Sequence, residues 1–187
     1  MTEAVLVMDM AKDTYDRASK RYQGDKVRVI VPPVQKLLRW ARSTCRPVIF
    51  ICSARRPTDK FWYSHFPQYK PDQNMWGTHG AQPIEDLYQK GDIVIYKRRL
   101  SGFYQSDLDI TLKELNINRV IIVGSSTHVA VMLTAIEAFQ RGVEVVIPKD
   151  CTTVAPGLNG GNYEWALKYM ETWAKAMITL SSDLTEN

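Results

Sequence analysis

The stretch from Arg119 to Gly142, RVIIVGSSTHVAVMLTAIEAFQRG, decides the fold of this chain. Residues 120–123 form a short apolar run rich in β-branched side chains, as expected of a strand buried on both faces. Gly124 interrupts the run, the next three residues are of types that begin helices, and residues 129–140 have helical periodicity. Gly142 favours a helix end. We predict a strand, a tight turn and a helix whose first N–H groups can bind an anion or a developing oxyanion.

Outward from this stretch, five further apolar segments predict strands, at residues 4–8, 47–52, 92–96, 143–147 and 177–180. Helical periodicity is expected between them, at residues 32–41, 107–115 and 163–175, with a short helical turn at 84–87. Residues 13–26, the 157–161 segment and the last few residues read as loops or a polar tail. Strands that alternate with helices favour a three-layer α/β/α sandwich around a six-stranded, mainly parallel sheet. The whole chain, residues 1–187, is expected to form a single domain.

Composition narrows the class of protein. The apolar fraction of 45% and the charged fraction of 24% are those of an ordinary globular protein. The formal charge of +4 arises from scattered residues, so neither nucleic acid nor a membrane is expected as a partner. The first residues lack the pattern of a signal peptide, and no apolar run approaches the length of a membrane span. Three cysteines without C-x-x-C spacing indicate reduced thiols and a cytoplasmic location.

Ligands of open parallel sheets bind outside the carboxyl ends of the strands. The residues expected there are Asp9, Lys97, Asp150 and the turn at 125–130. A carboxylate and an ammonium in one cleft can keep each other charged beside a substrate carbonyl. An ordinary ion pair at the edge of the sheet is the alternative interpretation.

The segment from residue 53 to 80 has no clear periodicity and contains many aromatic side chains, which is typical of a functional loop or lid. The alternative is that its rings simply cover the core. Within it, Trp62 and Trp76 are candidate apolar walls of a pocket. Arg55 and Arg56 could bind a substrate carboxylate, or lie as solvated side chains.

Four stretches, taken in order, resemble the isochorismatase-like hydrolases, which include nicotinamidases and N-carbamoyl amidohydrolases. The first strand with its Asp matches LVMDM at residues 6–10, and GTHGA at 77–81 matches the segment before the third strand. The stretch KRRLSGF at 97–103 resembles the one opened by the family's Lys. GSSTHVAV at 124–131 resembles the family's nucleophile turn, usually G-x-x-T-x-x-C-V.

The resemblance implies a catalytic triad of Asp9, Lys97 and a cysteine at the position of Ala130. It also implies an oxyanion hole formed by the N–H groups of Ser126 and Ala130, and a cis peptide between Ser125 and Ser126. A small-molecule substrate with an amide or ureido C–N bond, no cofactor and a homodimer or homotetramer are further expectations. The residues predicted to contact substrate are Tyr15, Trp62, Trp76, His79, Phe103, Ser125 and His128.

Ala130 departs from the pattern, because a methyl group cannot attack a carbonyl. Three explanations stand open. The first is a Cys→Ala exchange made to trap substrate in an intact amidohydrolase site. The second is the isochorismatase branch, which has a small residue here and cleaves a vinyl ether with Asp9 as the general acid. The third is a pseudoenzyme that binds a ligand or partner without turning it over.

Metal ligands are not indicated by the sequence. The nicotinamidase branch carries an Asp-x-His pair after its second strand, whereas residues 53–60 here read SARRPTDK. The three histidines, at positions 65, 79 and 128, are not at ligand spacing. Cys151 follows a predicted strand near the cleft, but a buried and inert thiol is the commoner state of such a residue.

Overall fold

The computed structural model describes residues 2–66, 72–154 and 162–186. Its centre is a parallel sheet in the order β3-β2-β1-β4-β5-β7, which confirms the predicted α/β fold. A seventh strand, β6, was not predicted and pairs with the end of β4 over two residues. The strands are β1 (Glu3–Met8), β2 (Val48–Ser53), β3 (Ile93–Lys97), β4 (Arg119–Ser125), β5 (Glu144–Pro148), β6 (Thr152–Thr153) and β7 (Met177–Thr179).

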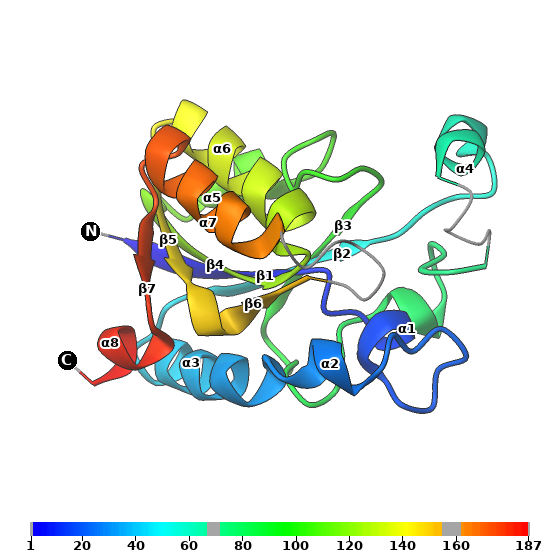
Figure 1. Ribbon diagram of the computed structural model, residues 1–187, viewed down its shortest axis with the longest axis horizontal. Coiled ribbons are helices and arrows are strands. Elements are labelled where there is room, and N and C mark those ends of the chain that lie inside the picture. Colours follow the sequence, from blue (N-terminus) through cyan, green and yellow to red (C-terminus); the bar gives the residue numbers. More distant parts are fainter. Residues whose placement is uncertain (1, 67–71, 155–161, 187) are drawn as a thin grey trace.

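Helices cover both faces of the sheet (Figure 1). One face carries α5 (Leu108–Glu114), α6 (Met132–Gln140) and α7 (Asn162–Trp173). The other carries α1 (Lys12–Tyr15), α2 (Asp25–Arg28), α3 (Val31–Ser43) and α8 (Ser181–Thr185). Strand β1 shows why two cores form: Leu6 and Met8 point to the first face and Val5 and Val7 to the second, since side chains alternate along a strand.

Several short elements differ from the prediction. Residues 13–26, expected as loop, contain the helical turns α1 and α2, and the expected tail contains α8. The irregular 53–80 segment contains α4 (Lys60–His65) and the 3₁₀ turn η1 (His79–Ala81), and another 3₁₀ turn, η3 (Lys149–Cys151), follows β5. Contacts distant in sequence hold such turns: the carboxylate of Asp150 accepts the Ser181 N–H at the start of α8 at 2.8 Å. Residues 84–87 form a short turn, as predicted, in which the Tyr88 N–H donates to the Ile84 carbonyl oxygen at 3.1 Å. The predicted 157–161 loop lies outside the described residues.

The turn after β4 is built around a close approach of two backbones. Gly124 has a φ of 106°, and a Cβ atom there would lie 2.2 Å from the carbonyl oxygen of Met8, so only glycine fits. The strand continues two residues beyond the predicted 120–123, and the peptide between Ser125 and Ser126 is cis. The chain then makes a π-helical turn, η2 (Thr127–Val131), before α6 begins.

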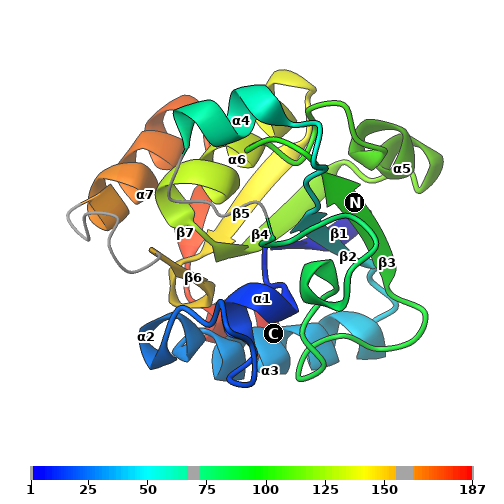
Figure 2. The ribbon, with the colours of Figure 1, turned by 90° about the vertical axis from the view of Figure 1, so that its right-hand side faces the viewer.

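Figure 2 looks onto the carboxyl ends of the strands, where α1 and α4 flank the end of the sheet. Residues far apart in the sequence therefore meet at this end, as expected of a parallel sheet. None of the helices in the described part of the chain is both long and apolar enough to cross a membrane.

Candidate functional site

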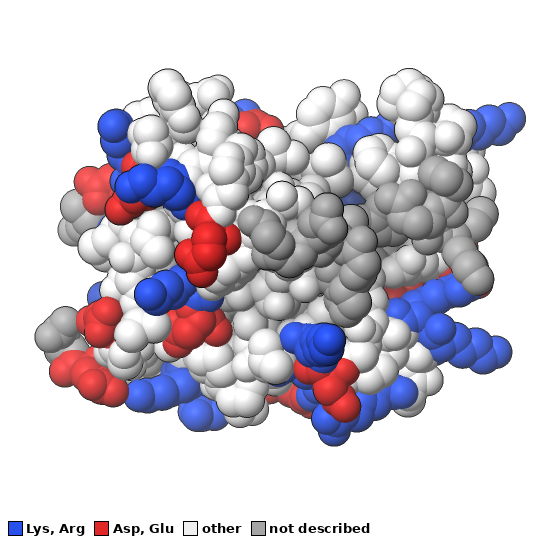
Figure 3. Space-filling view, in the orientation of Figure 1, with Lys and Arg blue, Asp and Glu red and all other residues white. Residues whose placement is uncertain are grey.

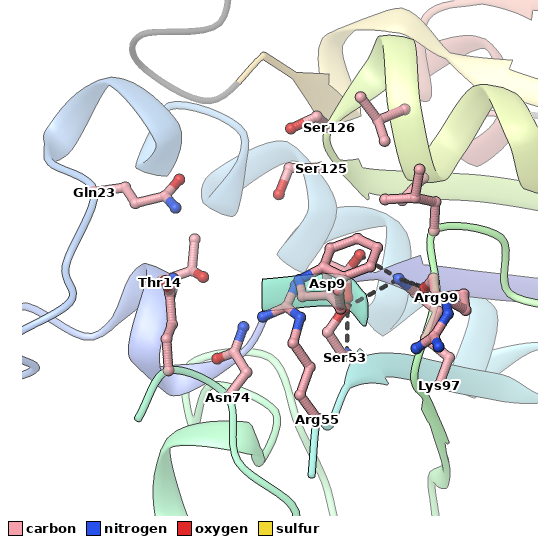
Figure 4. A pocket seen from close by; sticks show the side chains of 15 residues that line it. Asp9, Thr14, Gln23, Ser53, Arg55, Asn74, Lys97, Arg99, Ser125 and Ser126 are labelled. Carbon is pink, nitrogen blue, oxygen red and sulfur yellow. Dashed lines mark hydrogen bonds and ion pairs between the residues drawn. The ribbon is translucent and has the colours of Figure 1, made fainter. Parts of the chain in front are cut away.

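A buried ion pair joins the ends of β1 and β3. Asp9 follows β1 with a φ of 51°, a left-handed conformation that Asp adopts at less cost than most residues. Lys97 ends β3 opposite Ser53 of β2, and its Nζ lies 2.8 Å from Asp9 Oδ2. The other carboxylate oxygen, Oδ1, accepts the Ser53 N–H at 2.8 Å. Figure 4 shows this arrangement beside the cavity.

The ammonium group of Lys97 is almost entirely shielded from water, with 1% of its side chain exposed. Besides Asp9 it donates to Ser53 Oγ at 3.1 Å and to the carbonyl oxygen of Arg99 at 3.0 Å. These partners compensate the cost of burying the charge. The arrangement therefore holds the carboxyl group of Asp9 and the amino group of Lys97 against one cavity.

Opposite this pair lies the turn between β4 and α6. Ser125, Ser126, Val129 and Ala130 line the same cavity as Asp9 and Lys97. The N–H of Ser126 donates no hydrogen bond to another described residue, so it remains available for an acceptor in the cavity. A bound carbonyl oxygen could accept this N–H, as in an oxyanion hole.

The cavity has a volume of about 70 Å³, which is room for several water molecules or the reacting part of a small substrate. Sequence analysis did not single out several of its residues, because polar side chains in irregular segments give no periodic signal. The lining comprises Asp9, Thr14, Gln23, Ser53, Arg55, Trp62, Gln73, Asn74, Lys97, Arg99, Leu100, Ser125, Ser126, Val129 and Ala130.

Two guanidinium groups, those of Arg55 and Arg99, line the cavity. Arg55 packs over the ring of Trp62 with its Cζ 4.9 Å from the ring centroid, and its backbone N–H donates to the carbonyl oxygen of Asn74 at 2.8 Å. Arg99 lies 3.8 Å from Asp59, which also pairs with Arg98. Burial opposes ionisation of Asp59, but hydrogen bonds from Arg98 and from a backbone N–H outweigh it and lower its pKa.

Seven of the candidate site residues line this cavity: Asp9, Arg55, Trp62, Lys97, Ser125, Ser126 and Ala130. The other predicted substrate contacts are not among its lining residues. Tyr15 is fully buried on the α3 side of the sheet, and burial raises the pKa of its hydroxyl. Phe103 is buried in the opposite core, where Arg141 stacks on its ring at 4.4 Å.

Trp76, His79 and His128 also lie outside the lining. The ring of Trp76 is 52% exposed and packs edge-on against Tyr96. His79 Nε2 lies 2.8 Å from Lys12 Nζ, at a surface formed by α1 and η1. His128 is partly buried in the η2 turn, and burial lowers its pKa. The resemblance located these side chains by sequence position alone, which does not fix the direction in which they point.

None of the three cysteines is among the residues that line the cavity. Cys52 and Cys151 are fully buried, and burial is the main cause of the raised pKa of each. Cys45 is exposed at the other end of α3. Among residues 2–66, 72–154 and 162–186, no three His, Cys, Asp or Glu side chains gather as ligands around a metal ion would.

Comparison with known proteins identifies the family of this chain. The isochorismatase domain matches residues 3–182. The isochorismatase family protein YaaI of Bacillus subtilis is 27% identical over 190 residues, covering 98% of this chain and 97% of that protein. N-carbamoylsarcosine amidase of an Arthrobacter species is 27% identical over 158 residues, covering 79% of this chain and 58% of that enzyme.

The fold agrees with these sequence matches. The crystal structure of an isochorismatase-like hydrolase from Alkaliphilus metalliredigens superposes with a TM-score of 0.85 and 26% identity, covering 100% of this chain and 98% of that one. The domain match spans nearly the whole sheet and every residue of the cavity described above. This chain belongs to the isochorismatase family of hydrolases.

Proposed function

We propose that the cavity binds a small anionic compound with an amide or ureido group, the substrate class of a C–N hydrolase. The observation that supports this most is the Asp9 carboxylate, fixed by Lys97 and the Ser53 N–H, in the same cavity as the Ser126 N–H and Ala130. A base and an oxyanion donor around one small space suit attack on a carbonyl carbon. The name of the Arthrobacter relative, an N-carbamoylsarcosine amidase, points to the same class.

The role of position 130 follows from the chemistry of this class. A thiol there would give its proton to Asp9, and the thiolate would attack the carbonyl carbon. The N–H groups of Ser126 and residue 130 would stabilise the oxyanion while the C–N bond breaks and the amine leaves with a proton. Water would then hydrolyse the thioester. Ala130 supplies no thiol, so in this proposal the chain as written binds the substrate without forming an acyl-enzyme.

The charge that we expect of the substrate follows from two arginines in the lining of the cavity. Arg55 and Arg99 both line it, and a guanidinium can bind a carboxylate with two parallel hydrogen bonds. The lining sets one carboxylate, that of Asp9, against three cationic side chains: Lys97, Arg55 and Arg99. We therefore expect compounds that carry a carboxylate to bind more tightly than their neutral analogues.

A second candidate is hydrolysis of a vinyl ether. Two observations favour it: position 130 is small, as in the isochorismatase branch, and two arginines suit a substrate with two carboxylates. Asp9 would then have to be protonated in the complex, give that proton to the vinyl group and leave water to complete the cleavage. Protonation of Asp9 would give up its 2.8 Å ion pair with Lys97, and this loss opposes the route.

The test compares this protein with its Ala130→Cys and Ala130→Ser variants on carboxylate-bearing amides, N-carbamoyl compounds and isochorismate. We expect only Ala130→Cys to release amine or ammonia, and Asp9→Asn in that background to reduce the rate by 10²-fold or more. Ala130→Ser is the matched control, because it fills the same space with a weaker nucleophile. Calorimetry with the unaltered chain should detect binding of the compounds that Ala130→Cys hydrolyses.

The other outcomes are equally specific. Cleavage of isochorismate by the unaltered chain would replace the first candidate with the second. If no variant turns over any compound and the unaltered chain binds none, the C–N proposal is refuted and a pseudoenzyme with another ligand takes its place.

A further inference from the structure

Part of the cavity lining has no role in the chemistry proposed above. It comes from the 14–23 and 73–74 segments and consists of uncharged side chains that form hydrogen bonds: Thr14, Gln23, Gln73 and Asn74. In the view of Figure 4, the three of them that are labelled lie to the left of the Asp9–Lys97 pair. We call these four residues the neutral wall.

The side chains of the neutral wall are unpaired within the described part of the chain, since none of them forms a hydrogen bond with another described residue. Three are nevertheless buried: Thr14 is 7%, Gln73 8% and Asn74 6% exposed. The side-chain oxygen of Asn74 is shielded from water and accepts no hydrogen bond from these residues. Buried polar groups normally have a partner, because an unpaired one costs free energy. A ligand in the cavity can supply the partners that the fold does not.

Asn74 is held in place through its main chain, which leaves its carboxamide for another use. Its φ of 48° is a left-handed conformation that Asn adopts more readily than most residues. Its N–H donates to Asp13 Oδ2 at 2.7 Å, and its carbonyl oxygen accepts the Arg55 N–H at 2.8 Å. Gly80 leaves room for this arrangement, since a Cβ atom there would lie 2.3 Å from the carboxyl group of Asp13. A fixed main chain thus presents the carboxamide to the cavity, as a recognition residue requires.

The atoms of the neutral wall define the kind of group that it fits. Each carboxamide has one acceptor oxygen and two N–H donors, so the wall offers both donors and acceptors. A carboxylate can only accept, and it would leave the buried oxygen of Asn74 without a donor. An apolar group would leave donors and acceptors alike unpaired. An uncharged group with both N–H and C=O, such as a carboxamide, satisfies them all.

Positive charge is supplied by other parts of the lining. Its cationic side chains are Arg55, Lys97 and Arg99, whereas the neutral wall has none. In Figure 3, basic side chains project beyond the right-hand edge of the molecule, which is the end that Figure 2 views. A carboxylate of the substrate therefore finds its partners among the arginines and does not need the wall.

We propose that the neutral wall, with Asn74 as its principal residue, determines specificity by binding a second uncharged amide-type group of the substrate, separate from the C–N bond that is cleaved. This inference rests on the proposed function, in which the cleaved bond lies beside Asp9 and arginines bind a carboxylate. The substrate then carries three polar groups: the cleaved amide or ureido group, a carboxylate, and a carboxamide, ureido or lactam group that pairs with the wall. A site built to hydrogen-bond a group rejects analogues that lack it, because its own buried polar atoms are left unpaired.

Calorimetry with the unaltered full chain and four related compounds tests the proposal. N-carbamoylglycine carries only the ureido group and the carboxylate, so its binding tests the proposed function by itself. N-carbamoyl-asparagine adds a carboxamide, whereas the leucine and aspartate derivatives add an apolar group and a second carboxylate of the same shape. We expect the asparagine derivative to bind at least about tenfold more tightly than either of these two, because only it pairs with donors and acceptors of the wall.

Substitution of Asn74 then assigns the preference to the wall. Asn74→Gly removes the carboxamide and keeps the left-handed main chain, so it should reduce the preference for the asparagine over the leucine derivative by about fivefold or more. Asn116→Gly is the matched control, because Asn116 is exposed and has a φ of 53°, and it should keep the full preference. Circular dichroism melting curves identify a variant that fails to fold. Asn74→Asp, which retains the shape of the side chain, is then read by the same ratio of affinities.

The possible results separate this inference from the proposed function. If N-carbamoylglycine binds but the asparagine and leucine derivatives bind equally, the role of the wall is refuted and the proposed function stands. The same holds if the preference persists unchanged in the Asn74 variants, or if the aspartate derivative binds most tightly, since the wall would then take a carboxylate. Binding of none of the four compounds overturns both proposals.

Discussion

Removal of Asp9 from the Asp9–Lys97 pair should destabilise the protein at least as much as removal of both members. In Asp9→Asn the amide keeps the shape of the side chain, and Asn tolerates the left-handed backbone as well as Asp does. The ammonium of Lys97 is then left without its counter-charge at a site where only 1% of the side chain is exposed. Loss of one partner of a buried pair typically costs 3–5 kcal/mol. Since Ser53 Oγ and the Arg99 carbonyl remain as acceptors, we expect the lower end, about 3 kcal/mol.

The opposite substitution, Lys97→Met, leaves a carboxylate that is 21% exposed and still accepts the Ser53 N–H. We expect it to cost about 1–2 kcal/mol, the penalty of a weakened charged hydrogen-bond network. In the double variant neither charge remains, so its cost should fall below the sum of the single costs by about 2 kcal/mol. Such a coupling energy lies within the range measured for residues in contact.

Urea unfolding followed by circular dichroism measures these free energies, provided that all variants share the same slope. Glu171→Gln is the control, because Glu171 forms an exposed ion pair with Lys168, and its loss should leave the midpoint unchanged within error. If the costs of the two single substitutions simply add, or if Asp9→Asn is as stable as the parent, the pair does not compensate the buried charge as argued.

Three further predictions follow from other parts of the structure. Gly124→Ala should cost about 3 kcal/mol or more in chemical denaturation, because the added Cβ meets the backbone of β1 and requires a left-handed conformation; an unchanged midpoint would contradict the close approach. Burial lowers the pKa of His128, so its contribution to stability is present above its unfolded pKa near 6.5 and is lost as pH falls below that value; NMR titration should find its pKa below 6.5, and His128→Gln should flatten the dependence of stability on pH. A thiol reagent at pH 8 should modify only Cys45 in the folded protein and also Cys52 and Cys151 in urea, and rapid modification of two or three thiols without urea would show that the buried ones are accessible.

The six longer strands of the sheet could be predicted because each is a compact apolar run, whereas β6 is a pair of threonines. Residues 120–123 and 4–8 carry enough β-branched and aliphatic side chains to be recognised without any knowledge of their partners. The short helices α1, α2, α4 and α8 lacked such a signal. In α8, for example, the first N–H is held by Asp150, a contact across 31 residues that no local pattern contains. Turns of four to six residues are too short to be stable by propensity alone, so tertiary contacts decide them.

The residues of the candidate site also divide into those that the sequence predicts and those that it does not. Asp9 and Lys97 could be located because they end strands, and strand ends in a parallel sheet meet at one edge. Gln23 and Asn74 could not, since they come from irregular segments whose paths depend on contacts such as that between the Asn74 N–H and Asp13. His79 illustrates the remaining difficulty: its position in the chain is near the cavity, but its ring turns to Lys12.

The pairing of Ser53 with Lys97 across β2 and β3 has a consequence for how this chain can change in length. Successive side chains of a strand point to opposite faces, so one residue inserted into β3 would turn the ammonium of Lys97 away from Asp9. The connection from residue 54 to 92 is not bound by this alternation of side chains. Residues can therefore be added or removed there while the ion pair keeps its place. Insertions and deletions among relatives should therefore accumulate in that connection, where they reshape the cavity wall, and be absent from the five residues of β3. An alignment of relatives would show directly whether gaps divide in this way.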